Sequence, residues 1–115
     1  MKILIADDEK DLLDILKERL GFKGYDVDIA SDGKEAMTYV ASNNYDLVIV
    51  DHNMPEFTGI EVIRYIKGKN LSAKIVMLTG YPSMKDFFAK SIGADEYLSK
   101  PMKILEVEEL IKKYA

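Results

Sequence analysis

Several residue types are missing or scarce in this chain of 115 residues, and each absence excludes a class of chemistry. There is no cysteine, which excludes a disulfide, a thiol nucleophile and a thiolate metal site. No apolar run approaches the roughly 18 residues of a membrane span. The chain opens on a strand-like run, without the basic start and longer apolar stretch of a signal peptide. We therefore expect a cytoplasmic protein without a membrane partner.

Charge of one sign is also not concentrated anywhere. Sixteen basic residues stand against twenty acidic ones, for a formal net charge of −4, which argues against nucleic acid as the main partner. Apolar residues make up 48% of the chain, an ordinary globular composition. A chain of this length can form one hydrophobic core, so we expect a single domain over residues 1–115.

Short apolar runs recur along the chain and predict strands. Residues 3–6, 47–50 and 75–78 are apolar throughout, which is typical of central parallel strands covered on both faces. Residues 26–29 alternate between aspartate and apolar side chains, which indicates an edge strand with one wet face. Residues 97–98 are a fifth, shorter candidate.

Helical periodicity separates these strands. Apolar residues recur at helical spacing at Leu12, Leu16 and Leu20; Ala36, Met37 and Val40; Ile60, Ile63 and Ile66; and Leu105, Leu110 and Ile111. Asp32 can cap the second of these helices, and Ser83 with Asp86 suggests a capping box for a further helix that Gly93 can end. Five strand–helix units in alternation predict an α/β fold, a parallel sheet with helices on both faces.

Polar residues with chemical potential follow the predicted strands. Asp7 and Asp8 come after the first strand, Asp51 after the third, Thr79 after the fourth and Lys100 after the fifth. Because ligands of a doubly wound sheet bind at the carboxyl ends of its strands, we expect these five side chains to meet at one edge.

This set of residues suits phosphoryl transfer. Three crowded carboxylates repel one another, and a Mg²⁺ ion with its preference for oxygen ligands removes that conflict. Asp51 can act as a carboxylate nucleophile, while the ammonium group of Lys100 offsets charge on the phosphoryl oxygens. Each residue alone has an ordinary alternative as a solvated turn or a helix cap. The conjunction of all of them at successive strand ends favours a site.

The sequence resembles the receiver domain of bacterial response regulators over essentially its whole length. The resemblance rests on Ile5-Ala-Asp-Asp-Glu9, Val48-Ile-Val-Asp-His-Asn-Met-Pro55 with Gly59, Leu78-Thr-Gly80, and Gly93-Ala-Asp-Glu-Tyr-Leu-Ser-Lys-Pro101. It implies a flavodoxin-like, doubly wound (βα)5 fold with a five-stranded parallel sheet of order 2-1-3-4-5.

The resemblance also implies roles for single residues. Asp51 would be the phosphoacceptor. Mg²⁺ would be bound by Asp8 directly, by Asp7 through water, by Asp51, and by the backbone carbonyl of Asn53.

The resemblance further makes Thr79 the switch hydroxyl, Lys100 the phosphate-pairing amine and Tyr97 the switch aromatic. It also makes the Lys100–Pro101 bond cis.

We expect the surface that changes to be the fourth helix, the fifth strand and the fifth helix. Because Met84, Phe88 and Ile92 recur at helical spacing and should face the core, Phe87 should lie on this surface as a docking anchor.

Three further features of the sequence involve Phe57-Thr58, Tyr81 and His52. Phe57-Thr58 departs from the residues usual in the family, which bears on the loop after the acceptor. Tyr81 is bulky for a position beside the path of hydrolytic water, so we expect it to slow loss of the phosphoryl group. His52 is the only histidine, and we expect an exposed loop side chain rather than a phosphohistidine.

The resemblance thus predicts a stand-alone receiver that takes phosphate from a sensor histidine kinase or a phosphotransfer protein and binds a downstream protein target. It would not be a conventional enzyme, although it would catalyse its own phosphorylation and dephosphorylation. A receiver cut from a longer regulator would look the same.

Rival functions fit less well. A phosphatase of the haloacid-dehalogenase type needs Asp-x-Asp, which Asp51-His-Asn53 breaks. A flavin-binding domain needs a phosphate loop after the first strand, where Asp7 and Asp8 would repel phosphate. A receiver fold used as a constitutive interaction module would not need the complete acidic set.

Overall fold

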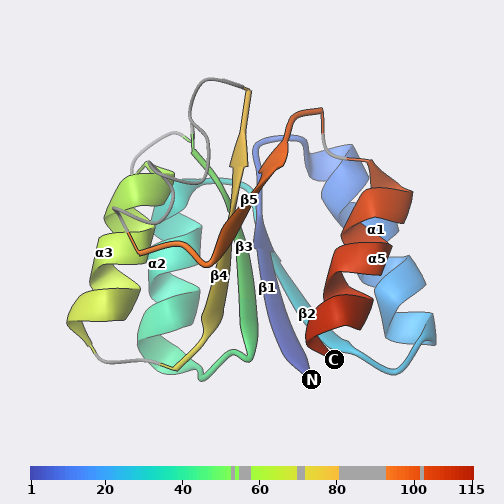
Figure 1. Ribbon diagram of the computed structural model, residues 1–115, viewed down its shortest axis with the longest axis horizontal. Coiled ribbons are helices and arrows are strands. Elements are labelled where there is room, and N and C mark those ends of the chain that lie inside the picture. Colours follow the sequence, from blue (N-terminus) through green and yellow to red (C-terminus); the bar gives the residue numbers. More distant parts are fainter. Residues whose placement is uncertain (53, 55–57, 70–71, 81–92, 102) are drawn as a thin grey trace.

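A computed structural model describes residues 1–52, 54, 58–69, 72–80, 93–101 and 103–115 of the chain. Its centre is a five-stranded sheet of order β2-β1-β3-β4-β5 in which every strand pair is parallel (Figure 1). The strands are β1 (Lys2–Ala6), β2 (Asp26–Ala30), β3 (Leu47–Asp51), β4 (Lys74–Thr79) and β5 (Glu96–Ser99). The predicted fold class and strand order are confirmed.

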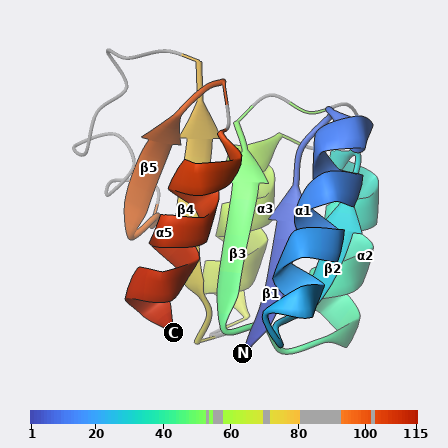
Figure 2. The ribbon, with the colours of Figure 1, turned by 90° about the vertical axis from the view of Figure 1, so that its right-hand side faces the viewer.

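Helices cover both faces of this sheet. Those that the described residues form are α1 (Lys10–Phe22), α2 (Gly33–Ser42), α3 (Gly59–Gly68) and α5 (Ile104–Tyr114). The pair α2 and α3 lies on one face, whereas α1 and α5 lie on the other (Figures 1 and 2). The helix predicted to start near Ser83 falls within residues 81–92, outside the described residues.

The two faces of the sheet have separate apolar cores. Successive side chains of a strand point to opposite faces, so Ile3 and Ile5 pack toward α1 and α5 while Leu4 packs toward α2 and α3. Both faces of β1 and β3 are therefore buried, which explains the unbroken apolar runs of the sequence.

The edge strands β2 and β5 are more exposed to solvent than the central strands, as the alternating pattern of residues 26–29 predicted for β2. In β2, Asp26 is exposed and the carboxylate of Asp28 accepts a hydrogen bond of 2.7 Å from the Tyr45 hydroxyl. All four residues of β5 keep some exposure. At the start of α2, Asp32 accepts a hydrogen bond of 2.8 Å from the Glu35 amide, so the predicted cap is confirmed.

None of the helices in the described part of the chain has both the length and the apolar character needed to cross a membrane.

The parallel arrangement of the strands has a further consequence for function. The carboxyl ends of all five strands lie along the same edge of the sheet, where β1 ends at Ala6, β3 at Asp51 and β4 at Thr79.

Candidate functional site

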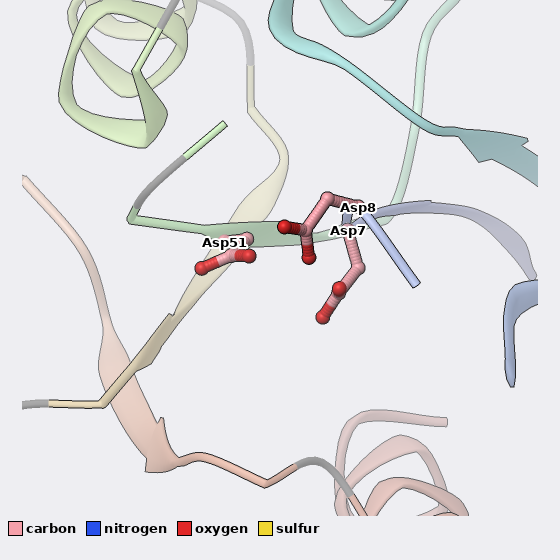
Figure 3. A group of neighbouring side chains, drawn as sticks. All are labelled: Asp7, Asp8 and Asp51. Carbon is pink, nitrogen blue, oxygen red and sulfur yellow. The ribbon is translucent and has the colours of Figure 1, made fainter. Parts of the chain in front are cut away.

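Three aspartate side chains converge at this edge. Asp7 and Asp8 follow β1 directly, and Asp51 is the last residue of β3, the strand that pairs with β1. One carboxylate oxygen from each lies within 4.8 Å of one from each of the others (Figure 3). Asp7 and Asp51 are buried, at 0% and 1% exposure, while Asp8 is exposed. The cluster therefore has two buried carboxylates and one open to solvent.

Local hydrogen bonds fix Asp7 in this place. Its backbone amide donates to the carbonyl of Ala30 in β2 at 3.0 Å, which continues the β1–β2 ladder by one residue. One of its carboxylate oxygens, Oδ1, accepts a hydrogen bond of 2.9 Å from the Glu9 amide. Burial raises the pKa of the Asp7 carboxyl to about 6; Asp8 and Asp51 act in the same direction, and the Glu9 amide and Lys100 oppose them.

The cluster fits a hard divalent cation. The other carboxylate oxygen of Asp7, Oδ2, is buried and has no hydrogen-bond partner among the residues that the structure describes. Leaving such an oxygen buried and unpartnered is costly. Carboxylate oxygens are the ligands that Mg²⁺ prefers, and a bound cation with its coordinated water would satisfy this oxygen and remove the repulsion between the carboxylates.

Lys100 brings the opposing charge to the same place. Its ammonium nitrogen, Nζ, lies 2.7 Å from Asp51 Oδ2, 3.7 Å from Asp8 Oδ1 and 3.8 Å from Asp7 Oδ1. Burial acts to lower the pKa of Lys100, but the hydrogen bond and charge of Asp51, with the two other acids, raise it above its ordinary value. The neighbouring acids thus favour the charged form of Lys100, which lies in contact with the predicted acceptor.

The position of Lys100 follows from the end of β5. Its backbone amide donates to the carbonyl of Thr79 at 2.7 Å, so the pairing of β4 with β5 extends one residue past Ser99. The peptide bond from Lys100 to Pro101 is cis, as expected from the resemblance.

Thr79 and Tyr97 occupy neighbouring positions on one face of the sheet. Thr79 is buried at 1% exposure and ends β4. Tyr97 pairs with Met77, two residues before Thr79, and therefore lies on the same face as Thr79. The Tyr97 ring is partly buried and packs against the core under α2 and α3. The two predicted switch residues are thus diagonal neighbours on adjacent strands.

Some predicted positions fall outside the described residues. These are Asn53, Phe57, Tyr81 and Phe87, so the structure does not place the predicted carbonyl ligand, the first residue of the unusual loop pair, the residue beside the water path or the docking anchor. His52 is described and differs from expectation. It is partly buried rather than exposed, and its amide donates to the carbonyl of Leu78 in β4 at 2.8 Å.

One feature of the loop after Asp51 was not predicted. Thr58 begins α3 with a capping box, in which its hydroxyl oxygen accepts a hydrogen bond of 3.3 Å from the Glu61 amide and its own amide donates to the Glu61 carboxylate at 3.1 Å. The signal was present in the sequence as Thr-Gly-Ile-Glu, the spacing of a capping box. Of the pair Phe57-Thr58 that the sequence singled out, Thr58 thus fixes the start of α3.

The geometry agrees with comparisons to known proteins. The family model of the response regulator receiver domain matches residues 3–112. The chain therefore belongs to the receiver domain family of response regulators, the signalling domains of two-component systems.

Among its relatives, response regulator MprA of Mycolicibacterium vanbaalenii is 36% identical over 108 residues, which cover 93% of this chain and 47% of MprA. Response regulator TrrA of Thermotoga maritima, solved in complex with Mg²⁺ and BeF, is 41% identical, with a TM-score of 0.81 over 99% of this chain and 98% of that chain. Chemotaxis response regulator CheY4 of Vibrio cholerae is 29% identical, with a TM-score of 0.87 over the same shares. The chain spans about half the length of the curated relatives it matches.

Proposed function

We propose that the chain accepts a phosphoryl group on Asp51 from a phosphohistidine of a sensor histidine kinase or a phosphotransfer protein. The reaction would take place in the cytoplasm, depend on Mg²⁺, and switch the binding of a downstream protein. One observation carries this proposal: the carboxylate of Asp51 lies within reach of two further carboxylates and in contact with the ammonium group of Lys100. The carboxylate proposed as nucleophile, a cation and the oxygens proposed to bind the metal thus lie close together.

In the proposed step, a carboxylate oxygen of Asp51 attacks the phosphorus atom. The new bond joins oxygen to phosphorus, and the bond that breaks joins phosphorus to the histidine nitrogen, which keeps the electron pair. The Lys100 ammonium already lies beside the attacking carboxylate and would pair with the phosphoryl oxygens once they arrive. The hydroxyl of Thr79 would donate to another of these oxygens.

Mg²⁺ would be held by Asp8 directly, by Asp7 through water, by Asp51 and by the backbone carbonyl of Asn53. When bound, it would supply positive charge against the oxygens of the transferring group. The fit of the three carboxylates and the unpartnered oxygen of Asp7 support this assignment. Further support comes from TrrA, a relative solved in complex with Mg²⁺ and BeF.

The output would follow from the position of Thr79 beside Tyr97. When the Thr79 hydroxyl turns toward the phosphoryl group, the space it leaves becomes available to the Tyr97 ring, which is only partly buried. The surface formed by the helix predicted between β4 and β5, by β5 and by α5 would then change. A ligand-dependent shift between two states separated by a few kcal/mol is enough for such a switch.

Two arrangements of the whole protein have precedents among the relatives. TrrA and CheY4 are matched over almost their full chains, as a stand-alone receiver would be. MprA is matched over 47% of its length, which favours the alternative of a receiver joined to an output domain. The intact mass of the natural protein distinguishes the two arrangements, and either one keeps the same phosphorylation site.

The direct experiment is phosphorylation by acetyl phosphate in the presence of Mg²⁺, followed by intact mass spectrometry. The wild-type chain should gain one phosphoryl group, and Asp51→Asn should abolish the gain. Asp46→Asn is a matched control, because Asp46 is an exposed aspartate before the opposite end of β3. Equal labelling of the Asp51→Asn protein would refute the assignment.

A further inference from the structure

The first residue of α3, Gly59, lies directly against the main chain of the acceptor residue. A side-chain Cβ atom at Gly59 would overlap the carbonyl oxygen of Asp51, and would lie 2.9 Å from its carbonyl carbon and 3.0 Å from the Cα atom of His52. The amide of Gly59 donates to the carbonyl of His52 at 3.1 Å. No side chain other than hydrogen fits between α3 and the end of β3.

Space rather than backbone conformation explains this glycine. Among the described residues, the glycines with a positive φ angle are Gly24 and Gly93, so Gly59 has a backbone conformation that other residues adopt. By contrast, a Cβ atom at Gly21 or Gly68 would meet nothing within 4 Å. Gly59 is thus distinguished by its contact with Asp51.

Neither side of this contact can move away freely. The start of α3 is held by the capping box of Thr58 with Glu61 and by the burial of Val62 in the core. On the other side, the His52 amide is hydrogen-bonded to the carbonyl of Leu78 in β4 at 2.8 Å. A larger residue at position 59 must therefore displace the main chain that carries the Asp51 carboxylate.

We infer that Gly59 is a positioning residue for the phosphoacceptor, an inference that rests on the proposed function of Asp51. By permitting close contact, it sets the distance of the Asp51 carboxylate from Lys100 Nζ, 2.7 Å, and from the two other acids. Phosphoryl transfer depends on such distances, because a displacement of about 1 Å can slow a positioned reaction roughly a hundredfold.

The test is Gly59→Ala, compared with Gly68→Ala as a matched control at the other end of the same helix. The rate of phosphorylation by acetyl phosphate should fall by at least about tenfold in Gly59→Ala, with weaker Mg²⁺ binding in an NMR titration, and stay unchanged in Gly68→Ala. Val40→Ala, which removes buried volume from α2, serves as a destabilised control that should keep the wild-type rate.

The outcomes separate the inference from the proposed function. If the wild-type chain is not phosphorylated at Asp51, the proposed function fails and the inference fails with it. If the wild-type chain is phosphorylated and folded Gly59→Ala reacts at the same rate with the same Mg²⁺ affinity, only the positioning role is refuted. If the Gly59→Ala protein does not fold even at low temperature, Gly59 is required for the fold itself and the positioning role is rejected.

Discussion

The ammonium nitrogen of Lys100 lies 2.7 Å from a carboxylate oxygen of Asp51, although 49 residues separate the two in the sequence. The pair spans from β3 across β4 to the end of β5. Asp51 is buried, so its negative charge needs this partner, and the partner lies where phosphoryl oxygens would gather. The same contact that makes the buried acid tolerable would also serve the transfer of the phosphoryl group.

Replacing Lys100 should therefore slow phosphorylation without removing the acceptor. We expect Lys100→Met to lower the rate with acetyl phosphate by about a hundredfold, the effect typical of losing one preorganised charge partner. Lys103→Met is the matched control. The Lys103 side chain is 69% exposed, and its ammonium nitrogen lies 3.8 Å from a carboxylate oxygen of Glu106. The rates are measured by intact mass spectrometry over time, and a Lys100→Met rate equal to that of the control would contradict the prediction.

Magnesium should stabilise the folded chain through the acidic cluster. At ten times its dissociation constant, Mg²⁺ should raise the free energy of unfolding by about 1.4 kcal/mol, because it binds the folded state alone. Asp8→Ala should weaken this effect more than Asp7→Ala, since Asp8 is the expected direct ligand. Asp11→Ala, an exposed residue in the first turn of α1, is the control.

The measurement is urea unfolding at increasing Mg²⁺ concentration. Stability that does not respond to millimolar Mg²⁺ would argue against the metal site. Equal losses in Asp8→Ala and Asp7→Ala would refute only the distinction between direct and water-mediated binding.

The sequence was sufficient for the parts of the fold that depend on pattern. Runs of apolar residues predicted β1, β3 and β4, and parallel topology then required that Asp7, Asp51 and Thr79 meet at one edge. The position of Lys100 follows from the same rule, because it comes directly after the strand predicted at residues 97–98. These features depend on the order of elements, which a single sequence displays.

Contacts between residues far apart in the sequence were not predictable in the same way. Nothing in the pattern indicates that Glu108 of α5 is paired with Arg19 of α1, because no rule of spacing connects them. The contact of Gly59 with the Asp51 carbonyl depends on the angle at which α3 meets β3. The capping box of Thr58 is local, and although it was not predicted, its Thr-Gly-Ile-Glu spacing is visible in the sequence.

The ion pairs of Glu108 in α5 with Arg19 and Lys23 beside it should make the free energy of unfolding depend on pH in the acidic range. The carboxylate of Glu108 is 7% exposed and lies 3.0 Å from Arg19 Nη2 and 3.3 Å from Lys23 Nζ. The hydrogen bond from Arg19, with help from Lys23, lowers the pKa of Glu108 below its ordinary value of 4.5. Its stabilising contribution is therefore complete above pH 4.5 and is lost as pH falls through the lowered pKa.

Glu108→Gln should reduce the loss of stability below pH 4.5, whereas Glu109→Gln, an exposed neighbour on α5, should retain it. Chemical unfolding at a series of pH values measures both. Parallel pH profiles for wild type and Glu108→Gln would show that other carboxylates account for acid sensitivity.

The relay from Thr79 to Tyr97 should be separable from the phosphorylation chemistry. Beryllofluoride with Mg²⁺ stands in for the phosphoryl group, and in the wild-type chain we expect NMR shifts at both residues. In Thr79→Ala the shifts around Asp51 should persist, because the acceptor, Lys100 and the acids are unchanged, but those of the Tyr97 ring should be lost. Ser99→Ala is the control: Ser99 pairs with Thr79 across β4 and β5 but is exposed, so its hydroxyl is not required by the relay.

The structure gives the reason to expect a difference, since the buried Thr79 shares a face of the sheet with Tyr97. A Tyr97 shift of full size in Thr79→Ala would rule out the hydroxyl as the relay, and a static Tyr97 in the wild type would rule out its part in the switch, while the phosphorylation site would stand in both cases.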